Sequence, residues 1–413
     1  MKISSRLMLV MLVAVMSLVV AACGAEATAT PVPPTATPTQ SGPEATPTPD
    51  ADAVFAAEWE ALIAEAKAEG ELSLVFGGSA GRNYRTLIDH FQELFGIQVI
   101  FSPGSGSKQT ERVLAEQSAG EFLVDVLMIG GTSAERLTAA NGLQPIRPWF
   151  IHPEILDESG WYKEQLWFTD AERQFVLNNG ATASPVNLTM RYNTELVSQA
   201  DIDGWGSIFD FLDPKWTGKI VALTPETGGA GGTYYGLMAN PTVDAEAFLN
   251  KLFDPALDVF FTEDFRLIAD GVANGKFAFG ILIGSAGRDI DKLEELGLPV
   301  KELIKELKEG YDLSGAGSGD NIMVPINPPH PAAAKLFLNW YLSREGQIAK
   351  HQISDGNPNP SLREDIPCDG NVKQANCRVA GKDYFYPTTD PAYTSRREEF
   401  VQLSRDLFRA ARQ

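Results

Sequence analysis

The sequence predicts an α/β fold in which mostly parallel sheets are covered by helices. Short apolar runs of strand length alternate with segments whose apolar residues recur at helical spacing, from Leu72 to about residue 350. Three of the strand-like runs finish in similar glycine-rich text, FGGSAG, MIGGTSA and TPETGGAGG. The repeated order of strand, helix, strand and helix implies parallel strands joined through helices.

The first 22 residues are typical of an export signal. Lys2 and Arg6 precede an apolar run that is too short for a comfortable membrane span and ends at Cys23. Val20-Ala21-Ala22-Cys23 resembles the bacterial lipobox, in which the signal is cleaved before a cysteine that receives lipid. A plain secretory signal with an incidental cysteine is the alternative.

Residues 23–54 predict a lipid-bearing cysteine followed by a disordered tether. The tether is rich in Thr, Pro and Ala and carries no Lys or Arg up to Asp52. Such a segment cannot bury enough apolar surface to offset the entropy lost on ordering. We therefore expect a protein held by a lipid anchor at the outer face of the cell membrane.

Composition limits the partners of the folded part. Hydrophobic residues make up 44% of the chain, which is ordinary for a globular protein. The formal net charge of −20 argues against nucleic acid, whose phosphates would be repelled. The remaining residues are enough for two domains, and we expect a monomer without a cofactor.

The first elements follow one another without interruption. Apolar residues of Phe55 to Ala68 share one helical face, and Gly70 ends that helix. Strands are expected at residues 72–76, 96–101 and 122–130, each followed by a helix. Thr132 or Ser133 is expected to cap the helix after the third strand, with Glu135 in its first turn.

The later elements continue the pattern after an irregular stretch between Trp161 and Ser184. One strand is expected to end near Asn193. Three further strands are expected at residues 219–223, 277–284 and 321–326. Ser285 is a possible cap for the helix after residue 284. One strongly amphipathic helix is expected from His330 to Gln347.

The stretch from Ile208 to Gly236 combines a turn, a buried strand, a glycine-rich loop and a helix start. Asp213-Pro214 breaks the preceding helical pattern, because proline fixes its own φ and restricts the residue before it. Ile220 to Leu223 then form a buried strand that leads into the glycines. A glycine-rich loop at a helix start leaves backbone N–H groups unpaired beside the positive end of the helix dipole. The loop is therefore a candidate anion site, and a plain surface loop is the alternative.

Cys368 and Cys377 are most simply a local disulfide that closes a surface loop in an oxidising compartment. A zinc site is disfavoured because the segment has neither a CxxC pair nor a histidine. The four histidines, at positions 90, 152, 330 and 351, fall on different expected elements and show no metal-ligand spacing. No metal site is predicted.

Several segments together resemble bacterial extracellular solute-binding proteins of ABC importers. They are the lipobox and tether, Arg191 to Thr194, Asp210 to Lys219, and the helix from His330 to Gln347. The ferric-iron-binding-like branch of type 2 periplasmic binding folds, which also includes binders of phosphonates, polyamines and thiamine, is the most similar. The resemblance spans about Leu72 to Asp365.

This resemblance implies two α/β lobes, each with a mixed, mostly parallel sheet and flanking helices, joined by hinge strands around a ligand. Lobe one would comprise residues 55–180 and 320–350, and lobe two residues 181–319. Residues 351–413 would complete the lobes with helices and the disulfide loop. The crossovers are expected near Val176–Tyr192 and Gly319–Pro325.

The resemblance also implies a ligand site and a permease partner. Ferric-binding relatives hold iron with a Tyr-Tyr pair, but the matching position here reads Gly284-Ser285-Ala286. Tyr234-Tyr235 falls in another element, where adjacent residues point about 100° apart, so core packing is the preferred interpretation. The loop at Thr227-Gly228-Gly229 matches the one that holds the anion accompanying iron in those relatives.

We therefore expect an organic carboxylate, phosphate or phosphonate as ligand, with a ferric complex as the alternative. Loops at strand ends and nearby arginines would grip it through helix starts and charge-assisted hydrogen bonds. The expected ligand residues are Ser79, Gly81, Arg82, Thr132, Ser133, Arg191, Asn193, Thr227, Gly228, Gly229, Ser285 and Arg288.

Two other functions fit parts of the sequence. Gly77 to Gly81 fits the G-x-S-x-G motif of serine hydrolases, with Ser79 as nucleophile and His330 or His351 downstream. The motif follows the first strand, however, whereas hydrolases place it deep in the sheet, so we expect no enzyme. Signalling to a membrane sensor in place of delivery to an importer is the second alternative.

Overall fold

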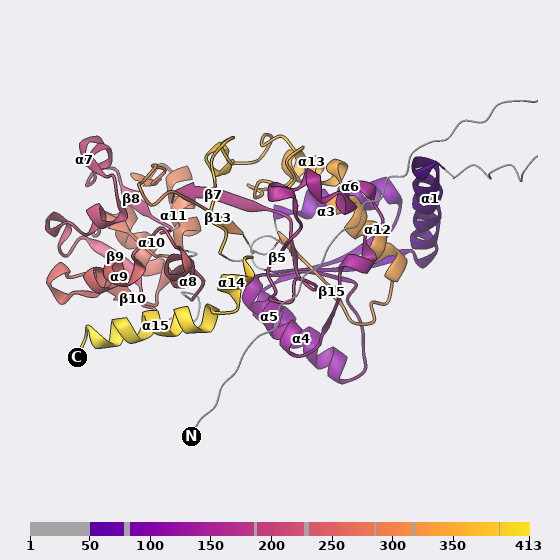
Figure 1. Cartoon of the computed structure of the whole chain (residues 1–413), viewed down its shortest axis with the longest axis horizontal. Coiled ribbons are helices and arrows are strands. Elements are labelled where there is room, and N and C mark those ends of the chain that lie inside the picture. Colours follow the sequence, from indigo (N-terminus) through magenta and orange to yellow (C-terminus); the bar gives the residue numbers. More distant parts are fainter. Residues whose placement is uncertain are drawn as a thin grey trace, which may run out of the picture. The chain divides into compact units, whose positions relative to one another are not determined.

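A computed structural model describes residues 50–77, 83–185, 188–226, 231–284, 286–315, 319–387 and 389–413 (Figure 1). The residues from Asp50 to Gln413 form one compact unit, and residues 1–49, with the signal, Cys23 and nearly all of the tether, lie outside the description. Two large apolar cores organise this unit. Lobe one denotes the part around Leu74, Phe91 and Trp340, and lobe two the part around Phe211, Phe253 and Phe279.

Lobe one contains a parallel sheet in the strand order β2-β1-β3. Strands β1 and β3 are almost wholly buried, whereas β2, at one edge of the sheet, is mostly exposed or half-buried. The first elements of this lobe are α1 (Ala51–Glu69), β1 (Glu71–Gly77), α3 (Arg85–Phe95), β2 (Gln98–Gly104), α4 (Gly106–Ser118), β3 (Val126–Met128) and α5 (Gly131–Ala139).

Smaller elements follow and extend lobe one by antiparallel pairing. They are β4 (Leu143–Gln144), α6 (Pro153–Leu156), β5 (Trp167–Phe168), β6 (Leu177–Asn178), β14 (Asn321–Ile322) and β15 (Val324–Pro325). The expected strand at residues 122–130 is thus only Val126–Met128.

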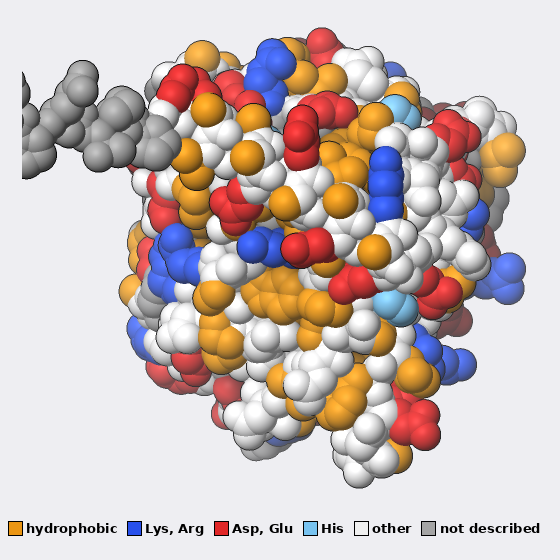
Figure 2. Space-filling model, turned by 90° about the vertical axis from the view of Figure 1, so that its right-hand side faces the viewer, with side chains coloured by type: hydrophobic (Ala, Val, Ile, Leu, Met, Phe, Trp, Pro, Cys, Tyr) orange, Lys and Arg blue, Asp and Glu red, His pale blue; other side chains and the backbone are white. Residues whose placement is uncertain are grey.

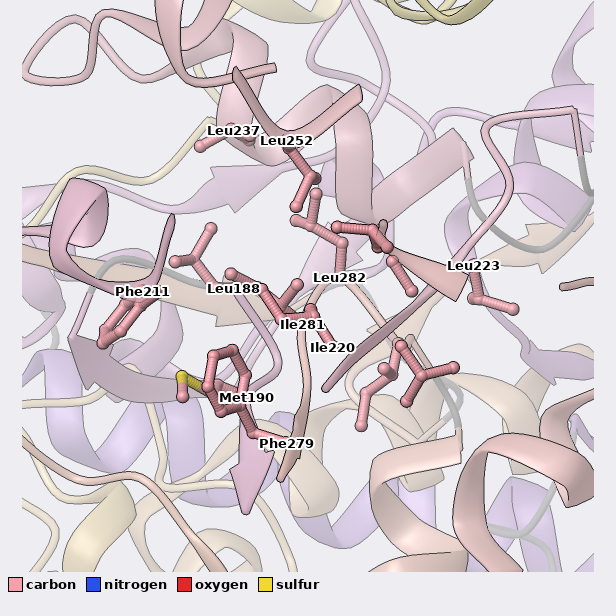
Figure 3. Packing of buried hydrophobic residues seen from close by; sticks show 14 of the residues in the cluster. Leu188, Met190, Phe211, Ile220, Leu223, Leu237, Leu252, Phe279, Ile281 and Leu282 are labelled. Carbon is pink, nitrogen blue, oxygen red and sulfur yellow. The ribbon is translucent and has the colours of Figure 1, made fainter. Parts of the chain in front are cut away.

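Lobe two contains a five-stranded mixed sheet in the order β10-β9-β11-β8-β12. Strands β9, β10 and β11 are parallel, and β8 runs against its two neighbours. Its elements are β8 (Arg191–Asn193), α7 (Gln199–Gly204), β9 (Ile220–Leu223), α8 (Gly231–Ala239), α9 (Ala245–Phe253), β10 (Phe260–Thr262), α10 (Phe265–Ala273), β11 (Phe279–Gly280), α11 (Ala286–Glu295) and β12 (Val300–Glu302). Figure 3 shows Ile220, Ile281 and Leu282 gathered in the middle of its core.

In the described part of the chain, three segments pass between the two cores. It leaves the lobe-one core after Ala183 and enters the lobe-two core at Leu188, then returns between Leu307 and Leu313. These passages contain β7 (Ala181–Pro185) and β13 (Tyr311–Gly315), which pair antiparallel. The return lies upstream of the crossover expected at Gly319–Pro325. A third passage leads from Tyr386 to Phe400.

The prediction of one continuous helix from His330 to Gln347 is wrong, because two helices occupy this stretch. They are α12 (Pro331–Leu342) and α13 (Arg344–Ile353), separated by Ser343 in an extended conformation. The Ser343 hydroxyl donates to the Trp340 carbonyl at 2.7 Å and accepts from the Gly346 N–H at 3.3 Å. Serine thus ends one helix and caps the next, which its local hydrogen bonding allows.

The C-terminal elements are α14 (Pro391–Thr394) and α15 (Arg397–Ala410). Phe400 and Phe408 of α15 are buried in the lobe-two core. Cys368 and Cys377 form a disulfide with an S–S distance of 2.04 Å, which closes the loop expected between them. Among the described residues, every helix is too short or too polar to cross a bilayer.

Candidate functional site

The carboxyl ends of the lobe-one strands carry the first candidate site. The strands β1, β2 and β3 are parallel, so α3, α4 and α5 all begin at the same edge of the sheet. In open α/β sheets ligands bind at this edge, outside the carboxyl ends of the strands.

The starts of α4 and α5 lie against each other at this edge. A methyl group built on Gly106 would lie 3.1 Å from Ser133 Oγ. The N-cap of α4, Ser105, makes no side-chain cap hydrogen bond, and the N-cap of α5, Gly130, has no side chain with which to make one. Helix starts present unpaired N–H groups and a partial positive charge, so two starts side by side favour an anionic or strongly accepting ligand group.

The cap expected at Thr132 or Ser133 is wrong, because the N-cap of α5 is Gly130. Ser133 is instead the third residue of the helix. The side chain of Thr132 lies outside the description. The sequence contains a signal for the neighbouring helix start, the run Gly104-Ser105-Gly106-Ser107 at the end of a strand.

The start of α3 is occupied by a carboxylate of the protein itself. Asp355 accepts hydrogen bonds from the backbone N–H of Thr86, at 2.8 Å, and from its hydroxyl. The Asp355 N–H donates in turn to the Asn83 carbonyl at 2.7 Å. This helix start is therefore neutralised. The loop before it, with Ser79, Gly81 and Arg82, lies outside the described residues.

The lobe-two candidate follows β9. Strand β9 ends at Leu223, and Thr224 to Glu226 carry the chain toward the glycine-rich loop. Thr227, Gly228, Gly229 and Ser285 lie outside the described residues, as does the side chain of Arg288. Two arginines of α15 form hydrogen bonds with the residues that lead into this loop. Arg405 Nε donates to the Pro225 carbonyl at 3.4 Å, and Arg409 Nε donates to Glu226 Oε1 at 2.8 Å.

Arg191, expected to bind ligand, is engaged inside lobe two. Its guanidinium forms two hydrogen bonds with the Asp291 carboxylate, at 2.7 and 3.1 Å, and an ion pair with Glu302 at 3.0 Å. Burial alone would lower its pKa, but these two carboxylates raise it. Both carboxylates already balance the charge of Arg191, which ties β8 to α11 and β12.

Asn193 also holds structure together within lobe two. Its side-chain amide donates to the Val272 carbonyl at 2.9 Å and accepts from the Glu195 N–H at 2.9 Å. Asn193 is 1% exposed. Arg191 lies opposite Gly280, the last residue of β11, and is therefore at the carboxyl end of that strand, but Asp291 and Glu302 engage its guanidinium there. Asn193 lies two residues further along β8, toward the other end of β11.

The preferred interpretation of Tyr234 and Tyr235 as core residues is confirmed. They are 0% and 1% exposed. The Tyr234 hydroxyl donates to the Leu223 carbonyl and that of Tyr235 to the Pro387 carbonyl, both at 2.7 Å. Burial raises the pKa of both phenols, which opposes the phenolate form that binds ferric iron.

A buried polar cluster at the base of the crossing strands was not predicted. Lys350 Nζ donates to Asn179 Oδ1 at 2.9 Å and lies 3.5 Å from Asp320 Oδ1. Asn179 N–H donates to the Asp320 carbonyl at 2.9 Å, and Asn359 Nδ2 donates to Asp320 Oδ2. We call these four residues the hinge-base cluster. Burial raises the pKa of Asp320 and lowers that of Lys350.

The two histidines considered for a hydrolase have structural contacts. Asp125 accepts from the backbone N–H of His330 at 2.7 Å, and its other oxygen lies 2.9 Å from His330 Nδ1. Asp125 is wholly buried and also accepts from the Ser73 N–H at 2.7 Å. This carboxylate therefore joins β1 to the start of α12. His351 bonds to Pro367 and Ser361.

A groove of about 680 Å³ lies on the outer side of lobe one, between α1 and α12. Figure 2 views this side and shows apolar side chains gathered among acidic and basic ones. Trp149 and Ile151 belong to its lining, and Glu65 and Lys335 add charge. It is not at the carboxyl ends of the strands. Within the described part of the chain, no three His, Cys, Asp or Glu residues gather as metal ligands.

A family model described as bacterial extracellular solute-binding protein matches residues 86–375. The chain belongs to this family. Its members are binding proteins, so this solute-binding protein is not an enzyme, and the hydrolase interpretation is set aside. The family also identifies a protein that works outside the cytoplasm on a small solute.

Solved structures of low sequence identity share the two-lobed fold. Iron-bound HitA from Pseudomonas aeruginosa is 19% identical with a TM-score of 0.56, covering 82% of this chain and 99% of its own. The Trichodesmium protein IdiA (FutA), in complex with iron and citrate ligands, is 17% identical with a TM-score of 0.55 and the same coverage.

AfuA from Actinobacillus pleuropneumoniae, with fructose-6-phosphate bound, is 14% identical with a TM-score of 0.54, covering 82% of this chain and 99% of its own. No curated protein matches the sequence. The bound groups in the three structures differ in chemistry, and at this identity the likeness shows the fold alone.

Proposed function

We propose that this solute-binding protein captures a small organic or phosphorus-containing anion between its lobes and delivers it to the permease of an ABC importer. The meeting of the α4 and α5 starts carries the proposal. Two uncapped helix starts at the carboxyl edge of a parallel sheet favour a ligand with negative charge or several acceptor oxygens.

The proposed site combines this edge with the loops of lobe two. Arg82 and Arg288 would supply charge-assisted hydrogen bonds, while Arg191 is left out because Asp291 and Glu302 already neutralise it. Lobe closure by bending at β7 and β13 would complete the grip. The proposed ligand residues are Ser79, Gly81, Arg82, Thr132, Ser133, Thr227, Gly228, Gly229, Ser285 and Arg288.

Two relatives make specific ligand classes worth testing. AfuA was solved with fructose-6-phosphate, and the Trichodesmium protein with iron and citrate. A sugar phosphate would match the proposed helix-start site through its phosphate. A ferric complex is the second candidate, in which an organic anion such as citrate would supply the ligands that this chain's buried tyrosines do not.

A calorimetric and thermal-shift screen tests the proposal. The panel contains fructose-6-phosphate, phosphonates, dicarboxylates, polyamines, thiamine, and ferric iron with and without citrate. We expect at least one organic anion to bind and raise the unfolding temperature by mass action. Binding of ferric iron alone, with no response to organic anions, would overturn it.

Introducing a negative charge where the starts of α4 and α5 meet tests whether the ligand binds there. Gly106→Asp puts a carboxylate beside Ser133 and is expected to weaken anion binding at least tenfold, in line with about 1.4 kcal/mol or more of repulsion. Ser118→Asp adds the same charge at the other end of α4, where it should leave binding unchanged. Equal affinities of the two variants would place the ligand elsewhere.

We also propose that Cys23 carries lipid and that residues 24–50 tether the lobes to the outer face of the membrane. This tether is shorter than the expected one, which reached residue 54, because α1 already begins at Ala51. Cells fed radiolabelled palmitate should label the parent protein and not a Cys23→Ser variant. Equal labelling of the parent and the variant would contradict a lipid anchor at Cys23. A permease and an ATPase encoded beside the gene would favour an importer over a sensor.

A further inference from the structure

The third passage between the cores is built into the hinge. Phe385 N–H donates to the Tyr311 carbonyl at 3.1 Å, and its carbonyl accepts from the Leu313 N–H at 2.7 Å. The segment therefore lies alongside β13, which pairs with β7. Everything after residue 375 lies beyond the part that the family model matches. The C-terminal segment thus adds a further connection to the two strands expected at a hinge.

Helix α15, at the end of this segment, is fastened to the ligand-facing edge of lobe two. Phe408 packs against Phe253, with ring centroids 5.2 Å apart, so the helix is anchored in the core. Arg405 and Arg409 then reach Pro225 and Glu226, the last described residues before the glycine-rich loop. The position of that strand end is linked to the position of α15.

The other end of α15 reaches lobe one. Arg397 Nη1 donates to Glu135 Oε1 at 2.9 Å, and Glu135 is the fifth residue of α5. Figure 1 shows α15, in yellow, running from beside α5 along the part that contains α8 and α9. The same guanidinium lies 5.3 Å from the centre of the Tyr235 ring, which is part of the lobe-two core. Arg397 therefore contacts both lobes.

We propose that Arg397 is a positioning residue for ligand binding and that α15 sets the separation of the two ligand-binding edges. Helix α15 contacts both edges. Arg405 and Arg409 contact the residues after β9 in lobe two, and Arg397 contacts α5 in lobe one. The functional meaning rests on the proposed function, since it assumes that these edges receive ligand. The Arg397–Glu135 pair is partly exposed, at 26% and 47%, so it is an adjustable contact and not a rigid one.

Distance measurement between the lobes tests this without any ligand. Spin labels at Glu121→Cys, before β3, and Lys251→Cys, in α9, report the interlobe distance in the otherwise unaltered mature chain with its disulfide intact. Arg397→Ala, Glu135→Ala and the double variant are compared with the parent. Arg396→Ala is the matched control, because Arg396 pairs with Glu399 of its own helix.

We expect each single variant to broaden the distance distribution, shifting the ratio of conformations by roughly two- to fivefold, the range for an exposed ion pair. The double variant should broaden it no further. Exchanging the charges, with Arg397→Glu and Glu135→Arg together, should restore the parental width, which loss of folding would not do. Arg396→Ala should match the parent.

The proposal would be overturned if the parent and Arg397→Ala gave the same distance distribution. It would also be overturned if Arg396→Ala broadened the distribution as much as Arg397→Ala, or if the charge exchange did not restore the parental width. The measurement needs no ligand, so a negative ligand screen leaves its result intact. Conversely, loss of the positioning role would leave a positive ligand screen standing. The two proposals can therefore fail separately.

Discussion

Two charged contacts join segments from different parts of the chain, and they differ chiefly in exposure. In the hinge-base cluster, the side chains of Lys350 and Asp320 are 0% and 3% exposed. In the contact between α15 and α5, Arg397 and Glu135 are 26% and 47% exposed. A buried charge is stable only beside its partner, whereas an exposed one can exchange its partner for water. The first contact should therefore fix the fold, and the second can change during lobe movement.

The largest expected effect comes from separating the buried pair. Lys350→Met keeps the length of the side chain but leaves the Asp320 carboxylate in the interior without its cation. Leaving one member of a buried pair alone costs about 3–5 kcal/mol of unfolding free energy. Chemical denaturation at pH 7 measures the loss.

Lys215→Met is the matched control for this experiment. Lys215 pairs with Asp201 at 2.8 Å but is 49% exposed, so its replacement should cost about 1 kcal/mol or less. Adding Asp320→Asn to Lys350→Met should recover part of the stability by removing the unpaired charge. A loss for Lys350→Met no larger than that for Lys215→Met would show that burial does not distinguish these contacts.

His351, the neighbour of Lys350 on α13, extends the comparison to pH. Its Nδ1 lies 2.9 Å from the Pro367 carbonyl, which can only accept, and its Nε2 accepts from the Ser361 N–H at 3.0 Å. These bonds require the neutral ring. Burial and the nearby charge of Lys350 lower the pKa of His351 to about 4, although Asp369 acts in the opposite direction.

The sign of the pH effect follows from this lowered pKa. Above pH 6.5 the ring is neutral in both the folded and the unfolded chain. Between pH 6.5 and about 4 only the unfolded chain gains the proton, so unfolding free energy is lost as pH falls, by up to about 3 kcal/mol. His351→Asn should flatten the dependence in this window. Parallel curves for parent and variant would contradict the assignment.

A smaller effect is expected from crowding the hinge-base cluster. An alanine methyl at Gly180 would lie 2.4 Å from Asp320 Oδ1 and 2.8 Å from Lys350 Nζ. The pair would have to shift, and overpacking of this kind costs about 1–3 kcal/mol. Gly236→Ala in α8, where the added methyl meets nothing within 4 Å, should cost nothing or stabilise. Equal denaturation midpoints of both variants and the parent would show that the cluster has room.

Local patterns in the sequence predicted those parts of the molecule that local forces determine. The strand and helix order of lobe one followed from apolar periodicity, and Tyr234 and Tyr235 were placed in the core because adjacent helix residues cannot face one ion. The disulfide followed from spacing and compartment. The break at Ser343 was missed, since a serine within a helical pattern gives no warning of which hydrogen bond it will make.

The site was harder to predict, because partners distant in the sequence decide which polar residues remain available. Arg191 is neutralised by Asp291, a hundred positions away, and Asn179 meets Lys350 across 171 positions. A single sequence shows an arginine but not its carboxylates. The start of α3 is likewise occupied by Asp355, 269 positions from Thr86. Spacing therefore located the edge of the sheet but not the groups that remain free there.

The smallest expected effect on stability is at the exposed contact. Glu135→Ala removes the carboxylate that Arg397 contacts. The Glu135 side chain is 47% exposed, and alanine favours the helix. We expect the unfolding free energy to change by less than about 1 kcal/mol, measured by denaturation beside Lys350→Met. The same variant is expected to broaden the interlobe distance distribution. A small loss of unfolding free energy together with a broader distance distribution would mean that the buried pair maintains the fold and that the exposed pair regulates lobe separation. A loss equal to that of Lys350→Met would instead make both contacts part of one rigid hinge.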